Sequence, residues 1–233
     1  PIFTDELLLE LTMRNLQRPG RSPVMASNAM IATSHPLASQ VGIDILKSGG
    51  NAVDAAIAAC ATLCVVEPAM TGIGGDCFSL YSPAGSEAPL ALNGSGRAPK
   101  AASVDGMRSK GVNTIEVQSA HAVTVPGAIA AWTKLNEDHG NKSMEELLVP
   151  AINYAENGFP VMHRVGVDWA GLQTKLLADD VASKVLLKNG EAPKIGTTFS
   201  QPLLAQTLRT ISHKGRDGFY KGAVAEDIVN RLN

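Results

Sequence analysis

Apolar residues recur at helical spacing between residues 36 and 66, and a proline or a glycine pair interrupts the pattern at its junctions. In the first segment the apolar positions share one helix face: Leu37, Val41, Ile45 and Leu46. Pro36 suits the first turn of that helix, and Gly49-Gly50 ends it. Asn51 is a suitable N-cap for a second helix, which Glu67-Pro68 stops. The pattern therefore predicts two successive helices.

The second helix is rich in alanine and has apolar residues on every side, so it leaves no face for solvent. We expect this helix to be buried under a sheet. The turn that follows, 71–76, contains three glycines, which can reach backbone conformations closed to other residues and which expose several N–H groups. Residues 77–81 and 90–93 then read as two antiparallel strands joined by a hairpin loop.

Further elements follow from the same rules of spacing, capping and breaking. Helices are predicted over about 6–16, 102–110, 128–136, 144–157, 164–177, 181–187, 201–214 and 223–232, and short strands over 28–33 and 122–125. The clearest helix start is a capping box from Ser143 to Glu146, and Ser200 is the predicted cap of the helix that contains Pro202. We interpret residues 1–25 as a turn-rich lead-in, and 26–233 as part of one domain.

Composition and charge narrow the class of protein. With 233 residues, of which 45% are hydrophobic, the chain can bury a sizeable core. A net charge of −2 and a pI near 6.2 give no electrostatic reason to expect nucleic acid or an anionic membrane as a partner. No apolar run reaches the roughly 20 residues of a membrane span, so no membrane segment is expected.

The residues offer little obvious chemistry by themselves. Cys60, Cys64 and Cys77 cannot all pair and are interpreted as free core thiols. No histidine has zinc-motif spacing with another ligand, and the glycines at 72, 74 and 75 precede a strand, unlike a dinucleotide fingerprint; neither metal nor cofactor is predicted. Ser34 and Ser95 lack an evident base. The residues alone indicate an α/β or α+β domain with two glycine-rich loops.

Successive motifs nevertheless form a recognisable series. The chain reads MIATSHPLASQ from residue 30, GGNAVDAA from 49, VEP from 66 and GIGG from 72. It continues with VPG from 125, LVPA from 148, GFP from 158 and FYKG from 219. Together these motifs closely resemble the gamma-glutamyltranspeptidase family, which is part of the N-terminal-nucleophile hydrolase group. The resemblance extends from about Met25 to the last residue.

This resemblance implies a zymogen that cleaves itself into a large and a small subunit and so frees a threonine at the start of the small subunit. That threonine would be the nucleophile and, through its α-amine, its own base, while backbone amides would hold the oxyanion. The chain resembles only the first part of the large subunit, so no catalytic residue is expected within it, and the small subunit is its expected partner. The implied fold is α+β, a four-layer αββα sandwich that is incomplete in this chain.

One loop departs from the family pattern. Members that bind a gamma-glutamyl group have an arginine, in an Arg-Glu-x-Ala-Pro context, that pairs with the substrate α-carboxylate. Aligning Ala98-Pro99 with that Ala-Pro places Ser95 at the arginine position and Arg97 two residues later, which disfavours the usual recognition. Two roles stay open for Arg97: it binds a small carboxylate of the substrate, or it stabilises the fold. The expected substrate-binding residues are Arg97, Ser95, Gly74, Gly75 and Asp76.

The loop Asn-Gly-Ser-Gly-Arg-Ala-Pro at 93–99, together with Asp76 where many relatives have glycine, resembles an intracellular transpeptidase-like branch. That branch includes an oxamate amidohydrolase and proteins labelled cephalosporin acylases. We therefore expect a cytoplasmic enzyme, or a periplasmic or secreted one if a signal peptide has been removed, that hydrolyses a small amide through an acyl-enzyme. Its large/small pairs could form a higher oligomer. The alternatives are true gamma-glutamyl transfer or glutathione hydrolysis, and a non-catalytic scaffold subunit.

Overall fold

The computed structural model describes residues 23–232 and divides into two units, Pro1–Met30 and Ile31–Asn233. In the first unit the described residues, 23–30, are exposed and form neither helix nor strand. The helix predicted over 6–16 lies outside the described residues. The strand predicted over 28–33 is wrong, because these residues have no ladder partner in the described part of the chain.

The two leading helices are confirmed. α2 spans Pro36–Lys47 and α3 spans Ala52–Val66. Gly49, between them, has φ +91°, a conformation that L side chains rarely adopt. α3 starts with a full capping box: the Asn51 side chain accepts from the backbone N–H of Asp54, and the Asp54 carboxylate accepts from the N–H of Asn51.

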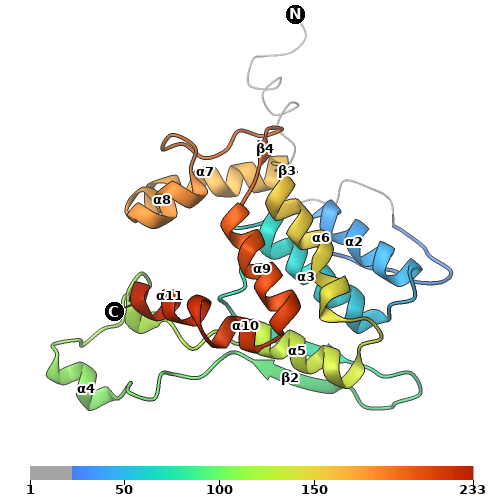
Figure 1. The fold of residues 1–233 in the computed structure, drawn as a ribbon, viewed down its shortest axis with the longest axis horizontal. Coiled ribbons are helices and arrows are strands. Elements are labelled where there is room, and N and C mark those ends of the chain that lie inside the picture. The colour runs from blue at the N-terminus through green and yellow to red at the C-terminus, as the bar shows by residue number, and fades with distance from the viewer. Residues whose placement is uncertain (1–22, 233) are drawn as a thin grey trace, which may run out of the picture. The chain divides into compact units, whose positions relative to one another are not determined.

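α3 is the centre of the core of the second unit, where it packs against α2, α5 (Ala128–His139) and α6 (Met144–Asn157). Figure 1 shows these helices side by side. Most of its residues are buried, as its apolar composition predicts. Cys60 is an exception: it is exposed, so its interpretation as a core thiol is wrong, whereas Cys64 is buried and Cys77 is partly buried. Ala52 and Ala56 share this exposed face with Cys60, one helical turn apart.

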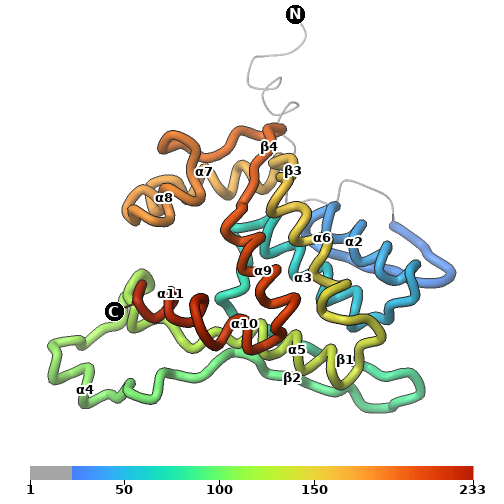
Figure 2. Tube along the Cα trace, viewed as in Figure 1, coloured from blue at the N-terminus to red at the C-terminus, as the bar shows by residue number. Residues whose placement is uncertain are grey.

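The predicted hairpin is present. β1 spans Cys77–Tyr81 and β2 spans Leu90–Gly94, and they pair antiparallel with Ser79 opposite Leu92. Both strands contact α5, which lies alongside them (Figure 2). The inner residues of β1 alternate with Phe78 and Leu80, which are 67% and 79% exposed. The hairpin therefore has one covered face and one open apolar face.

The remaining helices match predicted ones with small differences in bounds, except α10 (Asp217–Tyr220), which was not predicted. They are α4 Val104–Ser109, α7 His163–Leu177, α8 Asp180–Leu186, α9 Pro202–Lys214, α10 Asp217–Tyr220 and α11 Ala223–Leu232. Within residues 23–232, none has the length and apolar character required to cross a bilayer. The strand predicted over 122–125 is wrong: a 3-10 turn, Ala120–Ala122, is followed by extended backbone that pairs with a loop.

Two short strands were not predicted, β3 (Phe159–Pro160) and β4 (Thr198–Phe199), because each contains only two residues. Their pairing brings the start of α9 next to the end of α6. Gln201 occupies the N-cap position of α9, so the prediction that Ser200 caps this helix is wrong. The Gln201 backbone N–H donates to Ala155 at 2.7 Å, and its side chain donates to the Val65 carbonyl at 2.7 Å. This glutamine therefore joins three helices.

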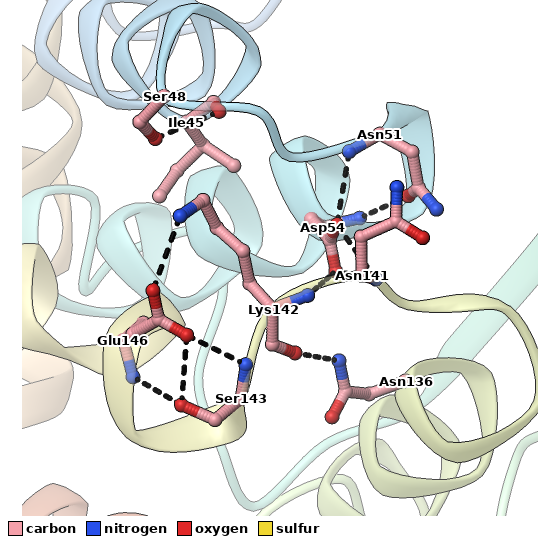
Figure 3. Close-up of polar contacts among 9 residues, drawn as sticks. All are labelled: Ile45, Ser48, Asn51, Asp54, Asn136, Asn141, Lys142, Ser143 and Glu146. Carbon is pink, nitrogen blue, oxygen red and sulfur yellow. Dashed lines mark hydrogen bonds and ion pairs between the residues drawn. The ribbon is translucent and has the colours of Figure 1, made fainter.

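A buried carboxylate connects the start of α3 to the loop between α5 and α6. Asp54 is 0% exposed, and besides Asn51 it accepts from the backbone N–H groups of Asn141 at 3.0 Å and Lys142 at 3.3 Å (Figure 3). The loop is then fixed to α6, because Ser143 and Glu146 form the predicted capping box. One side chain thus satisfies donors from two segments almost ninety residues apart.

We expect Asp54→Ala to lower the free energy of unfolding by about 3 kcal/mol, because it leaves three backbone donors without their charged acceptor. Chemical denaturation at neutral pH measures this change. Asp44→Ala, which removes an exposed carboxylate of α2, is the matched control and should change stability by less than about 0.5 kcal/mol. A loss below about 1 kcal/mol for Asp54→Ala would contradict the assignment.

His35 makes the fold sensitive to acid. Its side chain is 1% exposed, and its Nδ1 accepts a hydrogen bond from the Leu37 N–H at 3.2 Å. The neutral ring therefore carries its proton on Nε2, which has no hydrogen-bond partner among the described residues. Burial lowers the pKa of His35 from 6.5 to about 4, because the charged ring would lose its hydration.

Between these two pKa values the unfolded chain binds a proton at His35 that the folded chain does not. Stability should therefore be complete above pH 6.5 and fall by about 3 kcal/mol as the pH drops to 4. His35→Asn keeps a capping acceptor and should flatten this part of the stability curve, whereas His213→Asn, at an exposed position, should not. Equal pH dependence in the wild type and His35→Asn would refute this explanation.

Candidate active-site region

Three segments meet where α5 begins: the glycine turn 72–76, the loop 94–97 that follows β2, and residues 124–128, called the α5 entry segment below. Both glycine-rich loops bond to the entry segment through the backbone. The sequence separates the first loop from the entry segment by about fifty residues. The fold thus brings together two loops that the sequence presents apart.

The Gly75 carbonyl caps α5. It accepts from the N–H of Gly127 at 3.1 Å and from the N–H of Ala128 at 3.0 Å. The first N–H groups of a helix have no partner within the helix, and the N-cap of α5, Gly127, has no side chain to serve them. The turn therefore contributes a carbonyl to the structure, while its own Gly75 N–H donates to Gly72 at 3.2 Å.

The loop after β2 bonds to the same segment. The Val125 N–H donates to the Arg97 carbonyl at 2.9 Å, and the Thr124 hydroxyl donates to the Ser95 carbonyl at 3.4 Å. These bonds use the backbone of Ser95 and Arg97. Among residues 23–232 neither side chain makes a hydrogen bond or an ion pair, so both stay available to a ligand.

Glycine allows the backbones to come this close. A Cβ on Gly127 would lie 2.0 Å from the Gly94 carbonyl oxygen, and one on Gly94 would lie 2.7 Å from the Cys77 carbonyl oxygen. Gly96 has φ +79°, and a Cβ there would lie 2.0 Å from the Val125 oxygen. The obstructing atoms are backbone, which cannot rotate away. Larger residues at these positions would separate the loops.

An open cavity of about 700 Å³ lies beside this junction. Its floor includes Gly94 and Gly127, and its charged groups are Arg97, Lys100 and Arg216. None of the described residues that line it is acidic. Three cations without a counter-ion in the wall create a positive potential, which favours an anionic ligand such as a carboxylate.

Tyr220 closes one side of the cavity and supports the entry segment. Its hydroxyl donates to the Pro126 carbonyl at 2.5 Å and accepts from the Ala130 N–H at 3.2 Å. Burial raises the pKa of Tyr220 above its ordinary value, so the hydroxyl keeps its proton. The Arg216 guanidinium lies over the tyrosine ring, 5.2 Å from its centre.

The structure brings together some of the predicted site residues but not all. Ser95 and Arg97 line the cavity. Gly75 does not line it, but its carbonyl accepts from the first N–H groups of α5, which carries part of the cavity wall. Gly74 and Asp76 are exposed and do not line the cavity, and no glycine of the turn has a positive φ, so the expected special conformation is absent. Lys100, Arg216 and Tyr220 were missed as cavity residues. The only sequence signal for Tyr220 was the FYKG motif. Because this motif lies more than ninety residues after the start of α5, the sequence does not show that the tyrosine contacts it.

Desolvation raises the pKa of all three cysteine thiols, Cys60 included, so none is activated as a nucleophile. Burial raises the pKa of the Cys64 thiol to about 12, and burial also raises the pKa of Cys77. Cys60 and Cys77 line a separate small groove of about 180 Å³ between α3 and β1. Within the described residues no group of three or more potential metal ligands lies together.

Comparisons with known proteins agree with the sequence motifs. The family model described as Gamma-glutamyltranspeptidase matches residues 38–233. The chain is 38% identical over 213 residues to the glutathione hydrolase-like YwrD proenzyme of Bacillus subtilis, covering 90% of this chain and 40% of the relative. It is 36% identical over 214 residues to the oxamate amidohydrolase proenzyme of Klebsiella pneumoniae, covering 89% and 40%. The chain therefore spans about 40% of the length of these relatives.

Solved structures show the same relationship. The gamma-glutamyltranspeptidase of Helicobacter pylori superposes with a TM-score of 0.84 at 33% identity, covering 90% of this chain and 61% of that one. The cephalosporin acylase of Bacillus halodurans superposes with a TM-score of 0.80 at 37% identity, covering 91% and 42%. Likeness at this level extends to nearly all of the described fold.

We expect Gly127→Ala to lower the free energy of unfolding by about 2 to 3 kcal/mol, because the new methyl group must displace the Gly94 backbone. Gly171→Ala in α7 is the matched control, since a Cβ there meets nothing within 4 Å, and it should stabilise the protein by up to about 1 kcal/mol. Thermal or chemical unfolding measures both. If Gly127→Ala were as stable as the control, the close approach of the backbones would not constrain the fold.

Proposed function

Because the chain belongs to the gamma-glutamyltranspeptidase family, we propose that it is part of the large subunit of a self-processing N-terminal-threonine amidohydrolase. The relatives at 36–38% identity include proteins named as proenzymes, which supports activation by cleavage. In this proposal the catalytic threonine and the oxyanion donors lie on the small subunit. This chain supplies the fold beneath them and part of the substrate pocket.

The complete fold is proposed to be a four-layer αββα sandwich. The β1–β2 hairpin would belong to one central sheet, and α3 and α5 to the helical layer beneath it. The outer face of the hairpin supports this proposal, since Phe78, Leu80 and Ala91 leave an apolar surface exposed. A second sheet, with the small subunit, would cover that face.

The reaction would be an acyl transfer in two steps. The threonine hydroxyl attacks the amide carbon of the substrate while the threonine α-amine takes the hydroxyl proton. The α-amine then passes this proton to the amide nitrogen of the substrate, which leaves as the product amine. Water then attacks the resulting ester and releases the acid. The residues of this chain act on the acyl group: Arg97 holds a carboxylate of the substrate and so fixes the distance from the carbonyl to the nucleophile.

The observation that carries this proposal is the guanidinium of Arg97, which has no hydrogen-bond or ion-pair partner within residues 23–232, in a cavity with positive walls. The backbone of its loop is fixed by the hydrogen bond from the Val125 N–H and by the close backbone contact of Gly96. Because the backbone is already ordered, binding a ligand at Arg97 costs less conformational entropy. The displaced position of Arg97 relative to the usual family arginine favours a small carboxylate amide over a gamma-glutamyl group.

A second function has specific support. Several relatives are named glutathione hydrolase proenzymes, including one from Bacillus subtilis that is 38% identical over 212 residues. Gamma-glutamyl hydrolysis or transfer is therefore the alternative. A chromogenic gamma-glutamyl anilide, assayed with and without a dipeptide acceptor, distinguishes them. Faster release in the presence of the acceptor would favour transfer.

Intact-mass analysis and N-terminal sequencing of the purified full-length protein test self-processing. The proposal expects a second polypeptide that begins with threonine, and replacing this threonine by alanine should leave an uncleaved, inactive precursor. A full-length protein that stays uncleaved and has no such threonine would contradict the proposal and favour a scaffold function.

We expect Arg97→Ala to reduce kcat/KM for a carboxylate-bearing amide by at least about tenfold, because a charged hydrogen bond contributes about 1.5 to 3 kcal/mol. Stability should change little, since the exposed side chain makes no hydrogen bond or ion pair among the described residues. Arg108→Ala on the exposed surface of α4 is the control and should retain wild-type kinetics. Wild-type kinetics with reduced stability for Arg97→Ala would assign this residue to the fold.

A further inference from the structure

The cavity beside the α5 entry segment contains more positive charge than a single carboxylate needs. Arg97 and Lys100 come from the loop after β2, and Arg216 comes from the turn before α10, more than a hundred residues later. Among the described residues none of the three takes part in an ion pair. None of the described residues that line the wall is acidic, so none of them neutralises these cations.

Arg216 has a defined place in this wall. Its guanidinium carbon lies 5.2 Å from the centre of the Tyr220 ring, and the tyrosine is fixed by its two hydrogen bonds to the start of α5. The neighbouring carboxylate, Asp217, is already engaged with Lys221 at 2.8 Å. The positive charge of Arg216 is therefore held at the cavity by stacking and is not cancelled by the next residue.

We propose that Arg216 is a specificity-determining residue and that the cavity accepts an acyl group with two carboxylates. Arg97 binds one carboxylate, and Arg216 binds the other. An acyl group with a single carboxylate leaves Arg216 without a partner. This inference rests on the proposed function, because it names the class of substrate for the same site.

The test compares two probes that differ by one carboxylate: the 4-nitroanilide of glutaric acid, with one free carboxylate, and the terminal mono-4-nitroanilide of tricarballylic acid, with two. For the full-length processed enzyme we expect Arg216→Gln to lower kcat/KM at least about tenfold for the second probe, and less than threefold for the first. Arg216→Lys should recover part of the loss. Lys214→Gln, the same charge change at an exposed position outside the cavity, should affect neither probe.

Binding without turnover separates this inference from the proposed function. Titration calorimetry with 2-ethylsuccinate, which keeps the two carboxylates of the second acyl group, should show affinity at least about tenfold weaker for Arg216→Gln than for the wild type, and no such difference with pentanoate, which keeps one. If this holds while neither anilide is cleaved, the anion site stands and the amidohydrolase proposal fails. Cleavage or binding that Arg216→Gln reduces equally for both classes of probe, or leaves unchanged, would overturn the inference.

Discussion

The site depends on one close approach of two backbones. β2 and the loop before α5 meet at Gly94 and Gly127, where any Cβ would collide with a carbonyl oxygen. This contact brings the Ser95–Arg97 loop against the entry segment, and the Gly75 carbonyl then caps the helix from the other side. A helix start that would otherwise carry unsatisfied donors becomes the point at which two loops are fixed. The cavity and its cations exist because three backbone segments can occupy this small volume.

The hydrophobic core positions α5, and with it the junction of the two loops at the start of α5. α3 is buried along most of its length and contacts α2, α5 and α6, so the orientation of α5 is set by apolar packing. The Asp54 carboxylate adds a polar restraint at the far end of α5, by binding the loop that joins it to α6. At the near end, Tyr220 binds Pro126 and Ala130. α5 is therefore restrained at both ends, and its first turn supports the site.

Local signals predicted most helices and the hairpin, because caps, breakers and spacing act over a few residues. The Asn51 and Ser143 capping boxes and the β1–β2 hairpin are examples. Errors arose where distant parts of the chain decide the outcome. The exposed position of Cys60 depends on what covers α3, and the extended residues 123–125 pair with a loop in place of a strand. Arg97 and Ser95 were identified from the loop motif, but Arg216 and Tyr220 reach the cavity through tertiary contacts that spacing does not encode.

The central claim is that the loop after β2, held against the entry segment, presents Arg97 to a substrate carboxylate. The most direct test is a crystal structure of the full-length processed protein with glutarate bound. It should show a carboxylate within hydrogen-bond distance of the Arg97 guanidinium, inside the cavity beside α5, with the Gly75 carbonyl still accepting from Gly127 and Ala128. Glutarate bound at the N-terminal threonine while Arg97 points into solvent would contradict the claim.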